Sequence, residues 1–336
     1  MSNLIIPKGY SSSLDYMETQ RAIKKIKDFF QQELAYGLSL RRVSAPRFVD
    51  PESGLNDDLN GVERKVEFTS KDMDEKNIEV VQSLAKWKRM ALGKYGIRPG
   101  HGIYTDMDAI RRDEELDNIH SMYVDQWDWE KIITKDERND DYLEETVGKI
   151  YRALKNLGDF VNRHYPEIMT ELPNEIFFIT TQELEDMYPD KTPKEREDLI
   201  AKEKRAVFIK QIGGKLASGE KHDGRAPDYD DWTLNGDIIL WNDILEHAFE
   251  ISSMGIRVDE DAMLEQLRLA NAMDRAELPF HKAIINKELP YTIGGGIGMS
   301  RLCMYFLRKA HIGEVQVSVW PEDMIEECEK AGIQLL

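Results

Sequence analysis

The stretch TIGGGIGMSRL, Thr292 to Leu302, sets the interpretation of the whole chain. Its pattern predicts a strand, a glycine turn and then a helix. Because glycine has no side chain, a ligand or another group can lie flat against the backbone at these positions. Arg301 follows in the first turn of the helix, as a planar cation suited to phosphate or to stacking on a base. The alternative is a tight packing turn with a surface arginine. The glycines are Gly294, Gly295, Gly296 and Gly298.

Three common glycine motifs do not fit this stretch. A dinucleotide fingerprint requires glycine where Met299 or Arg301 stands. A Walker A loop requires Gly-Lys-Ser/Thr, and a nucleophile elbow requires glycine at Leu302. The pattern that remains resembles motif 3 of the class II aminoacyl-tRNA synthetases, a glycine-rich strand and an arginine that bind ATP.

Composition limits the class of protein. The chain has 336 residues, a formal net charge of −18 and two cysteines. Length alone predicts about two domains, but no linker or repeat separates them, so we expect one catalytic domain over residues 1–336. The acidic charge argues against a nucleic-acid partner, because phosphate binding needs an excess of Lys and Arg. The first residues resemble neither a signal peptide nor a membrane span, so we expect a cytoplasmic protein without membrane contact.

The N-terminal third carries a helix and an extended run. Apolar residues at three- and four-residue spacing predict an amphipathic helix over residues 14–38, with Gly37 as its stop. The next run, LRRVSAPRFVD, is extended and contains Pro46. A helix followed by a proline-containing strand resembles class II motif 1, which builds a dimer interface. An ordinary helix–strand pair is the alternative.

Two charged segments follow. The loop at residues 54–61 is rich in turn residues and contains Asp57, although a loop carboxylate is usually solvated. Residues 78–96 then predict a strand running into a helix, with Lys86, Lys88 and Arg89 within one helical turn. These cations form either a solvated face or a binding site for an anionic substrate.

Residues 102–133 predict a hairpin with a long charged loop. Arg111 closes the first arm. In the second arm, HSMYVDQWDWE, residues two apart point the same way, so Gln126 and Asp128 share a face and could hold an α-amino group. An arginine before the loop and an amide or acid after it resembles class II motif 2, where the arginine contacts the ATP α-phosphate and the acyl oxygen. The alternative is a solvent-facing strand end.

The second half supplies further acids. A polar loop carries Asp228, Asp230 and Asp231, but the spacing lacks the glycine and the terminal glutamate of a calcium loop, and its role stays open. The predicted strands at 234–241 and 245–258 carry Asp237 and Glu250, one acid each. This placement fits a pair of Mg²⁺ ligands for a bound triphosphate. Helices are predicted at 142–165, 193–204, 259–271 and 280–288, and strands at 175–181, 206–214 and, last, 315–323.

Longer strings extend the resemblance across nearly the whole chain. AKWKR, YVDQWDWE, RAPDYDDW, LNGDI, FEISSMGIRV and TIGGGIG-S-RL, in that order, resemble the ammonia-dependent asparagine synthetases, the AMP-forming aspartate–ammonia ligases. That family shares the catalytic fold of aspartyl- and asparaginyl-tRNA synthetases. The resemblance implies an α+β fold with an antiparallel sheet flanked by helices, a homodimer, and the formation of asparagine, AMP and pyrophosphate from L-aspartate, ATP and ammonia.

The resemblance also implies roles for individual residues. Asp57 is expected beside the new amide, with Asp128 kept mainly for the α-amino group. The catalytic residues are then Arg111, Asp57 and Arg301. The substrate-binding residues are Ser83, Lys88, Gln126, Asp128, Ser252 and Ser253. The ATP-binding residues are Arg111, Asp230, Asp237, Glu250, Gly296, Gly298 and Arg301, of which Asp237 and Glu250 would also hold Mg²⁺.

Two other classes of protein remain as alternatives. A tRNA-charging enzyme would need an anticodon-binding domain, and the helix that starts near Leu14 leaves no room ahead of it. A catalytically inactive paralogue acting as an amino-acid sensor would have damaged motifs, whereas Arg111, Asp237, Glu250 and Arg301 are all present.

Overall fold

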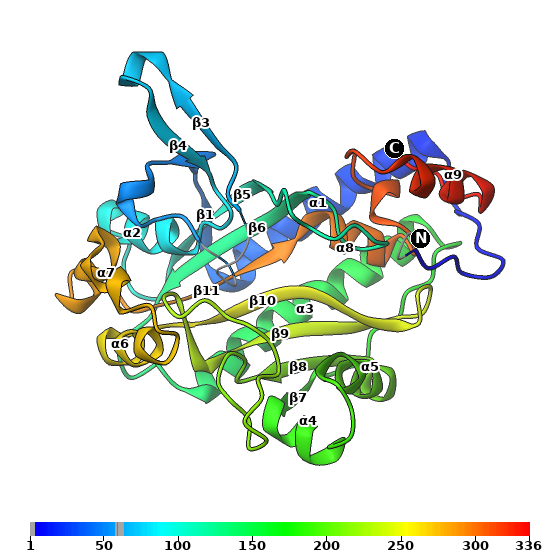
Figure 1. Cartoon of the computed structure of the whole chain (residues 1–336). Coiled ribbons are helices and arrows are strands. Elements are labelled where there is room, and N and C mark those ends of the chain that lie inside the picture. The colour runs from blue at the N-terminus through cyan, green and yellow to red at the C-terminus, as the bar shows by residue number, and fades with distance from the viewer. Residues whose placement is uncertain (1–3, 58, 60–63) are drawn as a thin grey trace.

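In the computed structural model, which describes residues 4–57, 59 and 64–336, strands of very different length form two sheets (Figure 1). They are β1 (Leu40–Arg42), β2 (Phe48–Val49), β3 (Glu67–Ser70), β4 (Lys76–Val80), β5 (Gly102–Ile110), β6 (Tyr123–Ile132), β7 (Phe177–Thr180), β8 (Ala206–Lys210), β9 (Asp230–Asn242), β10 (His247–Arg257) and β11 (Thr292–Gly298). The main sheet has eight strands in the order β1–β5–β6–β11–β10–β9–β8–β7, and β2–β4–β3 form the smaller sheet.

The main sheet is antiparallel through its centre, as the sequence predicts. From β5 to β8 every neighbouring pair is antiparallel, whereas the outer pairs β1–β5 and β7–β8 are parallel. The glycine strand β11 lies in the middle, between β6 and β10. The most unusual stretch of the sequence therefore forms the centre of the sheet.

Helices cover the sheet on both faces. They are α1 (Tyr16–Leu38), α2 (Ala85–Tyr95), α3 (Asp140–His164), α4 (Thr181–Met187), α5 (Pro193–Lys204), α6 (Glu260–Leu269), α7 (Pro279–Ile285), α8 (Met299–Phe306) and α9 (Glu322–Lys330), with short 3-10 turns η1 (Pro51–Ser53), η2 (Lys71–Met73), η3 (Met273–Glu277) and η4 (Ile312–Glu314).

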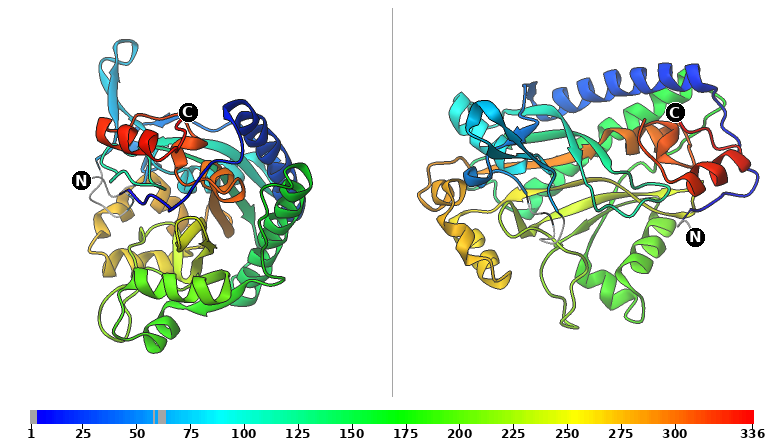
Figure 2. Two further views of the ribbon diagram at one scale, coloured as in Figure 1. Left: turned by 90° about the vertical axis from the view of Figure 1, so that its right-hand side faces the viewer. Right: turned by 45° about the horizontal axis from the view of Figure 1, so that its top comes forward.

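One face of the main sheet carries the largest hydrophobic core. Helices α1 and α3 run side by side along it (Figure 2), and Phe29 stacks on Phe160 with ring centroids 4.3 Å apart. Trp127 and Trp129 of β6 point into this core, where both are almost fully buried. Because side chains alternate along a strand, Gln126 and Asp128 must point to the opposite face.

That opposite face is covered unevenly. Helices α4 and α5 pack on its β7–β9 end through a second apolar cluster. Toward β6 and β11 it is lined instead by polar side chains, by the start of α2 and by the loop between β8 and β9. This uneven cover places a polar cavity over the centre of the sheet.

Several predicted boundaries need correction. Gly37 lies inside α1, and the left-handed residue that ends the helix is Ser39, with φ of 60°. The strand predicted from residue 234 begins at Asp230, so Asp230 and Asp231 belong to β9. Residues 315–323 contain no strand, because among the described residues no neighbouring strand pairs with them, and Val317 and Val319 are exposed. None of the helices in the described ranges is long and apolar enough to cross a membrane.

Candidate active site

The glycine strand forms a bare floor because side chains of β6 lie across it. Gly294 pairs with Glu130 and Gly296 pairs with Asp128 in the register of β11 and β6. A Cβ atom on Gly296 would lie 2.3 Å from Oε1 of Gln126, and one on Gly294 would lie 2.0 Å from Oε2 of Glu130. The glycines are therefore required by the polar side chains that reach over them, as well as by any ligand.

Above this floor lies the larger of two adjoining cavities, of about 310 Å³. Lys88 enters it from α2, and its Nζ lies 3.3 Å from Oδ1 of Asp128 and donates a 3.2 Å hydrogen bond to the carbonyl of Gly295. Burial lowers the pKa of Lys88, although Asp128 and Glu130 oppose that shift. A buried lysine with carboxylate partners is a fixed cation next to the floor.

Arg257, at the end of β10, is the central cation of this cavity. Its guanidinium donates to both oxygens of Glu130, with a shortest distance of 2.7 Å, and also pairs with Asp230. Burial alone would raise the pKa of Glu130, but Arg257 and Lys88 outweigh it and hold that pKa below its usual value. For Asp230 burial outweighs Arg257, and the pKa is raised.

The loop that carries Asp57 is tied to the cavity wall. Asn56 donates to Glu79 and accepts from the backbone N–H of Gln82, while Gln82 donates to the carbonyl of Asp57 at 3.1 Å. Lys86 donates to the carbonyl of Asn56 at 3.2 Å. Asp57 is almost fully buried and lines the larger cavity. Residues 58, 60 and 61 of the predicted loop lie outside the described residues.

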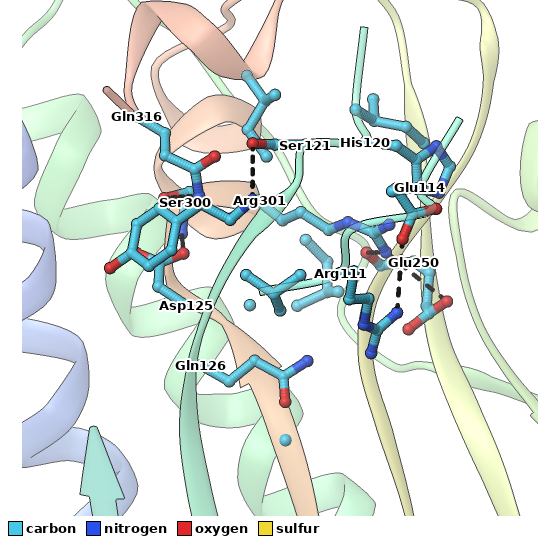
Figure 3. A pocket seen from close by; sticks show the side chains of 17 residues that line it. Arg111, Glu114, His120, Ser121, Asp125, Gln126, Glu250, Ser300, Arg301 and Gln316 are labelled. Carbon is cyan, nitrogen blue, oxygen red and sulfur yellow. Dashed lines mark hydrogen bonds and ion pairs between the residues drawn. The ribbon is translucent and has the colours of Figure 1, made fainter. Parts of the chain in front are cut away.

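The smaller cavity, of about 190 Å³, holds the two arginines of the predicted ATP site (Figure 3). Nη1 of Arg301 donates to the carbonyl of Glu250 at 3.2 Å and lies 3.6 Å from its carboxylate. Arg111 lies 3.9 Å from Glu114 of the hairpin loop. Figure 3 shows both arginine side chains converging beside Glu250. Two cations on one wall are suited to a polyphosphate.

Helix α8, which carries Arg301, is capped from a neighbouring strand. Its N-cap is Gly298, which has no side chain to offer. Asp125 of β6 instead accepts the backbone N–H of Ser300 at 2.9 Å, and Lys27 of α1 lies 2.9 Å from the same carboxylate. An acceptor at a helix N-terminus stabilises the first turn, and here it fixes the position of Arg301.

The two cavities share one floor. Arg111, Gln126, Glu250 and Gly296 line both of them. A ligand in the smaller cavity and a ligand in the larger one therefore meet over Gly296, between an arginine and an amide. This arrangement is suited to a reaction between two bound molecules.

The predicted metal ligands have a different environment from the one expected. Glu250 lines both cavities, but Asp237 lies behind them in an ion pair with Arg225, and Oδ1 of Asp237 is buried without a hydrogen-bond partner among the described residues. Burial, reinforced by the nearby Glu250, raises the pKa of Asp237 to about 7 in spite of Arg225. Within the described ranges no cluster of three or more His, Cys, Asp or Glu residues could hold a metal ion.

Most of the predicted side chains come together. The larger cavity collects Asp57, Ser83, Lys88, Gln126, Asp128, Asp230, Glu250 and Ser253, and the smaller one collects Arg111, Gln126, Glu250, Gly296, Gly298 and Arg301.

Ser252 departs from this pattern because a β-bulge shifts the register. The irregularity lies between Glu250 and Ser252, and it turns Glu250 and Ser253 to the cavity while Ser252 lines neither cavity. Asp230, predicted to bind ATP, lines the larger cavity, where it pairs with Arg257.

The lining residues that were not predicted include Arg225, Tyr229 and Arg257. The signal for Arg257 was available, because Ser253, Gly255 and Arg257 follow a two-residue spacing along β10. No comparable signal exists for Arg225 and Tyr229, because their loop between β8 and β9 reaches the cavity only through tertiary folding.

Known proteins of similar sequence match nearly the whole length of this chain. A family model described as aspartate-ammonia ligase matches residues 17–332. An aspartate–ammonia ligase of Clostridium tetani is 63% identical over 333 residues, which cover 99% of this chain and 98% of that protein. One of Ruminiclostridium cellulolyticum is 62% identical over 336 residues, the whole of both chains.

Solved structures agree at the level of the fold. Asparaginyl-tRNA synthetase of Pyrococcus horikoshii, in complex with asparaginyl-adenylate, superimposes with a TM-score of 0.65 at 15% identity, over 90% of this chain and 70% of that one. Asparaginyl-tRNA synthetase of Entamoeba histolytica gives a TM-score of 0.62 at 12% identity. The fold is therefore that of the class II synthetases, as the glycine stretch predicts.

Proposed function

The chain belongs to the aspartate–ammonia ligase family, and from that premise we propose that it makes L-asparagine from L-aspartate, ATP and ammonia through a β-aspartyl-adenylate. AMP and pyrophosphate are the other products. The observation that carries this proposal is the shared floor of the two cavities, since the amino acid and the nucleotide have to meet for the acyl group to be activated. We further propose that residues 1–336 act as one catalytic domain.

The first step joins the two substrates. A carboxylate is a poor acyl donor, so an oxygen of the β-carboxylate attacks the α-phosphorus of ATP and the bond to pyrophosphate breaks. Gln126 and Asp128 hold the α-amino group, and Lys88 with Ser83 holds the α-carboxylate, which leaves the β-carboxylate facing Arg111. Arg111 and Arg301 offset the charge that develops on the phosphate, so catalysis is mainly positioning and charge neutralisation.

The second step transfers the acyl group to nitrogen. At neutral pH ammonia is mostly the ammonium ion, which is not nucleophilic. A carboxylate attracts that cation and then takes its proton, after which the nitrogen attacks the acyl carbon and the bond to AMP breaks. Asp57, on the wall of the larger cavity, is proposed for this role. Its backbone carbonyl accepts a hydrogen bond from Gln82, which supports the proposal by fixing this part of the loop at the cavity wall.

Mg²⁺ is proposed as the metal that accompanies ATP. Oδ1 of buried Asp237, which has no hydrogen-bond partner among the described residues, and the carboxylate of Glu250 are both potential oxygen ligands. Mg²⁺ is commonly held by one or two carboxylates together with substrate phosphates. When bound, the metal would neutralise phosphate charge. We expect Glu250→Ala to weaken the use of ATP much more than the binding of aspartate, measured by initial rates at varied ATP and by aspartate calorimetry. Unaltered ATP use at ordinary Mg²⁺ would remove this assignment.

We also propose a cytoplasmic homodimer. The proposal rests on the resemblance of α1 and the proline-containing segment after it to the class II motif that builds a dimer interface. Light scattering coupled to size-exclusion chromatography tests the dimer, and a mass of one chain would contradict it.

Product analysis tests the reaction as a whole. The purified protein is incubated with ¹⁵N-ammonium, L-aspartate and Mg–ATP, and the products are separated by chromatography with mass detection. We expect ¹⁵N-asparagine and AMP in equal amounts. Formation of ADP in place of AMP would contradict the adenylate, and a product without ¹⁵N would contradict ammonia as the nitrogen source.

A further inference from the structure

We propose that the guanidinium of Arg225 and the divalent cation occupy the carboxylate of Asp237 alternately, and that the displaced Arg225 then binds a carboxylate of the substrate aspartate. The proposal rests on the proposed function for the identity of the substrate. It assigns Arg225 the role of a residue that couples the binding of the metal nucleotide to the binding of the amino acid.

The first observation is the environment of Asp237. Its side chain is 7% exposed, and among the described residues it forms an ion pair with Nη2 of Arg225. A buried carboxylate needs a compensating cation, because removing an ionised group from water without a partner costs several kcal/mol. Arg225 therefore serves as the counter-ion of Asp237 when no metal is bound.

The second observation is how Arg225 is attached. The surrounding loop between β8 and β9 is anchored on both sides, since His222 lies 3.0 Å from Glu197 and Trp232 donates to the carbonyl of Ala226 at 3.2 Å. Among the residues that the structure describes, the side chain of Arg225 also pairs with Asp223, whose side chain is 63% exposed. A pair with an exposed acid is weak. The Arg225 side chain can therefore change partner while the loop stays in place.

The two cations compete for one carboxylate. Oδ1 of Asp237 is buried without a hydrogen-bond partner among the described residues, and Asp237 pairs in the sheet with Ser253 of β10, the strand that also carries Glu250. A divalent ion held between these two acids would lie next to a guanidinium, and two like charges at such a distance repel each other. Binding of the metal therefore favours release of Arg225.

The released side chain has an adjacent destination. Arg225 already lines the larger cavity, where Lys88 is engaged with Asp128 and Arg257 with Glu130 and Asp230. The remaining cation of this lining, Arg111, is shared with the smaller cavity, where we place the nucleotide. A dicarboxylate substrate brings two negative charges into this cavity. A guanidinium that has lost its carboxylate pairs well with a new one, in a bidentate arrangement.

The metal arm of the test uses Mn²⁺ and no nucleotide. Mn²⁺ binding to the purified full chain is followed by electron paramagnetic resonance, in the parent and in Arg225→Met. We expect Arg225→Met to bind Mn²⁺ about tenfold more tightly, because one competing charge has been removed. Arg205→Met is the matched control, since Arg205 pairs with Asp243 on the surface outside both cavities, and its Mn²⁺ affinity should equal that of the parent.

The substrate arm uses calorimetry with aspartate, with and without Mg²⁺ and a non-hydrolysable ATP analogue. We expect the metal nucleotide to raise the affinity of the parent for aspartate about tenfold, and Arg225→Met to lose that increase. Arg225→Lys, which keeps the charge, guards against a loss that comes only from misfolding, and it should retain part of the increase. Thermal unfolding of each variant establishes that it is folded.

An Mn²⁺ affinity that is the same in Arg225→Met and the parent would overturn the exchange. So would an aspartate affinity that the metal nucleotide leaves unchanged in the parent. Neither measurement requires turnover, so this failure differs from failure of the proposed function, which would appear as absence of ¹⁵N-asparagine from the parent enzyme.

Discussion

At the scale of single residues, Arg301 is the side chain on which the nucleotide chemistry most depends. We expect Arg301→Ala to reduce aspartate-dependent pyrophosphate release by about 100- to 1,000-fold, because it removes a preorganised cation from a developing phosphate charge. The measurement is a coupled pyrophosphate assay, with circular dichroism as the check on folding. Arg308→Ala is the control, since Arg308 lies beyond the same helix and outside both cavities. Near-normal turnover in Arg301→Ala would contradict the nucleotide site.

Substitutions of Asp57 and Asp128 should affect the two half-reactions differently. We expect Asp57→Asn to leave adenylate formation largely intact while asparagine formation falls and the requirement for ammonium rises, because the amide neither attracts the ammonium cation nor accepts its proton. Asp128→Asn should instead raise the KM for aspartate in both half-reactions. Pyrophosphate exchange reports the first half-reaction and ¹⁵N-asparagine the second. An equal loss of both in Asp57→Asn would assign the ammonium to another residue.

The sequence predicted the functional side chains better than their partners. Arg111, Lys88 and Arg301 could be identified because each lies within a local pattern. The pairing of Arg257 with Glu130 joins residues 127 positions apart, and the pairing of Arg225 with Asp237 depends on how a loop folds over the sheet. Such pairings are set by tertiary structure, so a single sequence gives no register from which to infer them.

At the scale of the element, the glycine strand has two faces with different requirements. A Cβ on Gly295 would lie 2.5 Å from Cβ of Met254 and 2.7 Å from the carbonyl of Ser253, atoms that belong to the core and the backbone. A Cβ on Gly296 would meet only the ends of Gln126 and Asp128. The two positions should therefore differ in what a methyl group disturbs.

We expect Gly295→Ala to lower the free energy of unfolding by roughly 1–3 kcal/mol or more, because the backbone has to shift. Gly296→Ala should unfold nearly as the parent does but bind aspartate more weakly, because Gln126 has to leave its place over the floor. Urea unfolding and aspartate calorimetry on both variants check the contrast. Equal losses of stability would show that both faces serve packing alone.

Element boundaries were least predictable where tertiary contacts decide them. Helix α4 was not predicted, although Thr180 and Glu183 form a capping box at its start. β9 extends back to Asp230 because Arg257 of β10 pairs with it beyond an irregularity in the register, which the turn residues around it do not indicate. At Val317 and Val319 an alternating pattern exists, but a strand needs a neighbour as well as a pattern.

At the scale of the whole molecule, His311 gives stability a pH dependence. Its ring is fully buried, 4.7 Å from Trp320 between ring centroids, and its Nδ1 accepts the N–H of Gly313. Burial lowers the pKa of His311 to about 4, from an ordinary 6.5. Between pH 6.5 and 4, His311 is protonated in the unfolded chain but neutral in the folded chain. The free energy of unfolding therefore falls as the pH falls from 6.5 toward 4.

We expect this residue to contribute roughly 3 kcal/mol to the loss of stability across that window. His311→Gln, which keeps an acceptor for Gly313, should flatten the dependence of the urea midpoint on pH between 4 and 6.5. His164→Gln, at an exposed position, should leave it unchanged. A parent and a His311→Gln variant with parallel pH profiles would contradict the assignment.

The floor common to both cavities has a consequence for inhibition. An amino-acid group and an adenosine group joined by a short, stable, uncharged bridge over Gly296 would form one bivalent inhibitor. Once one half is seated, the other is held at an effective concentration in the millimolar range, so the tethered compound should bind far more tightly than an equimolar mixture of its halves. Lengthening the bridge beyond the span of Arg111 and Gln126 should remove that gain in affinity. The dependence of affinity on bridge length would then report the distance between the two bound substrates.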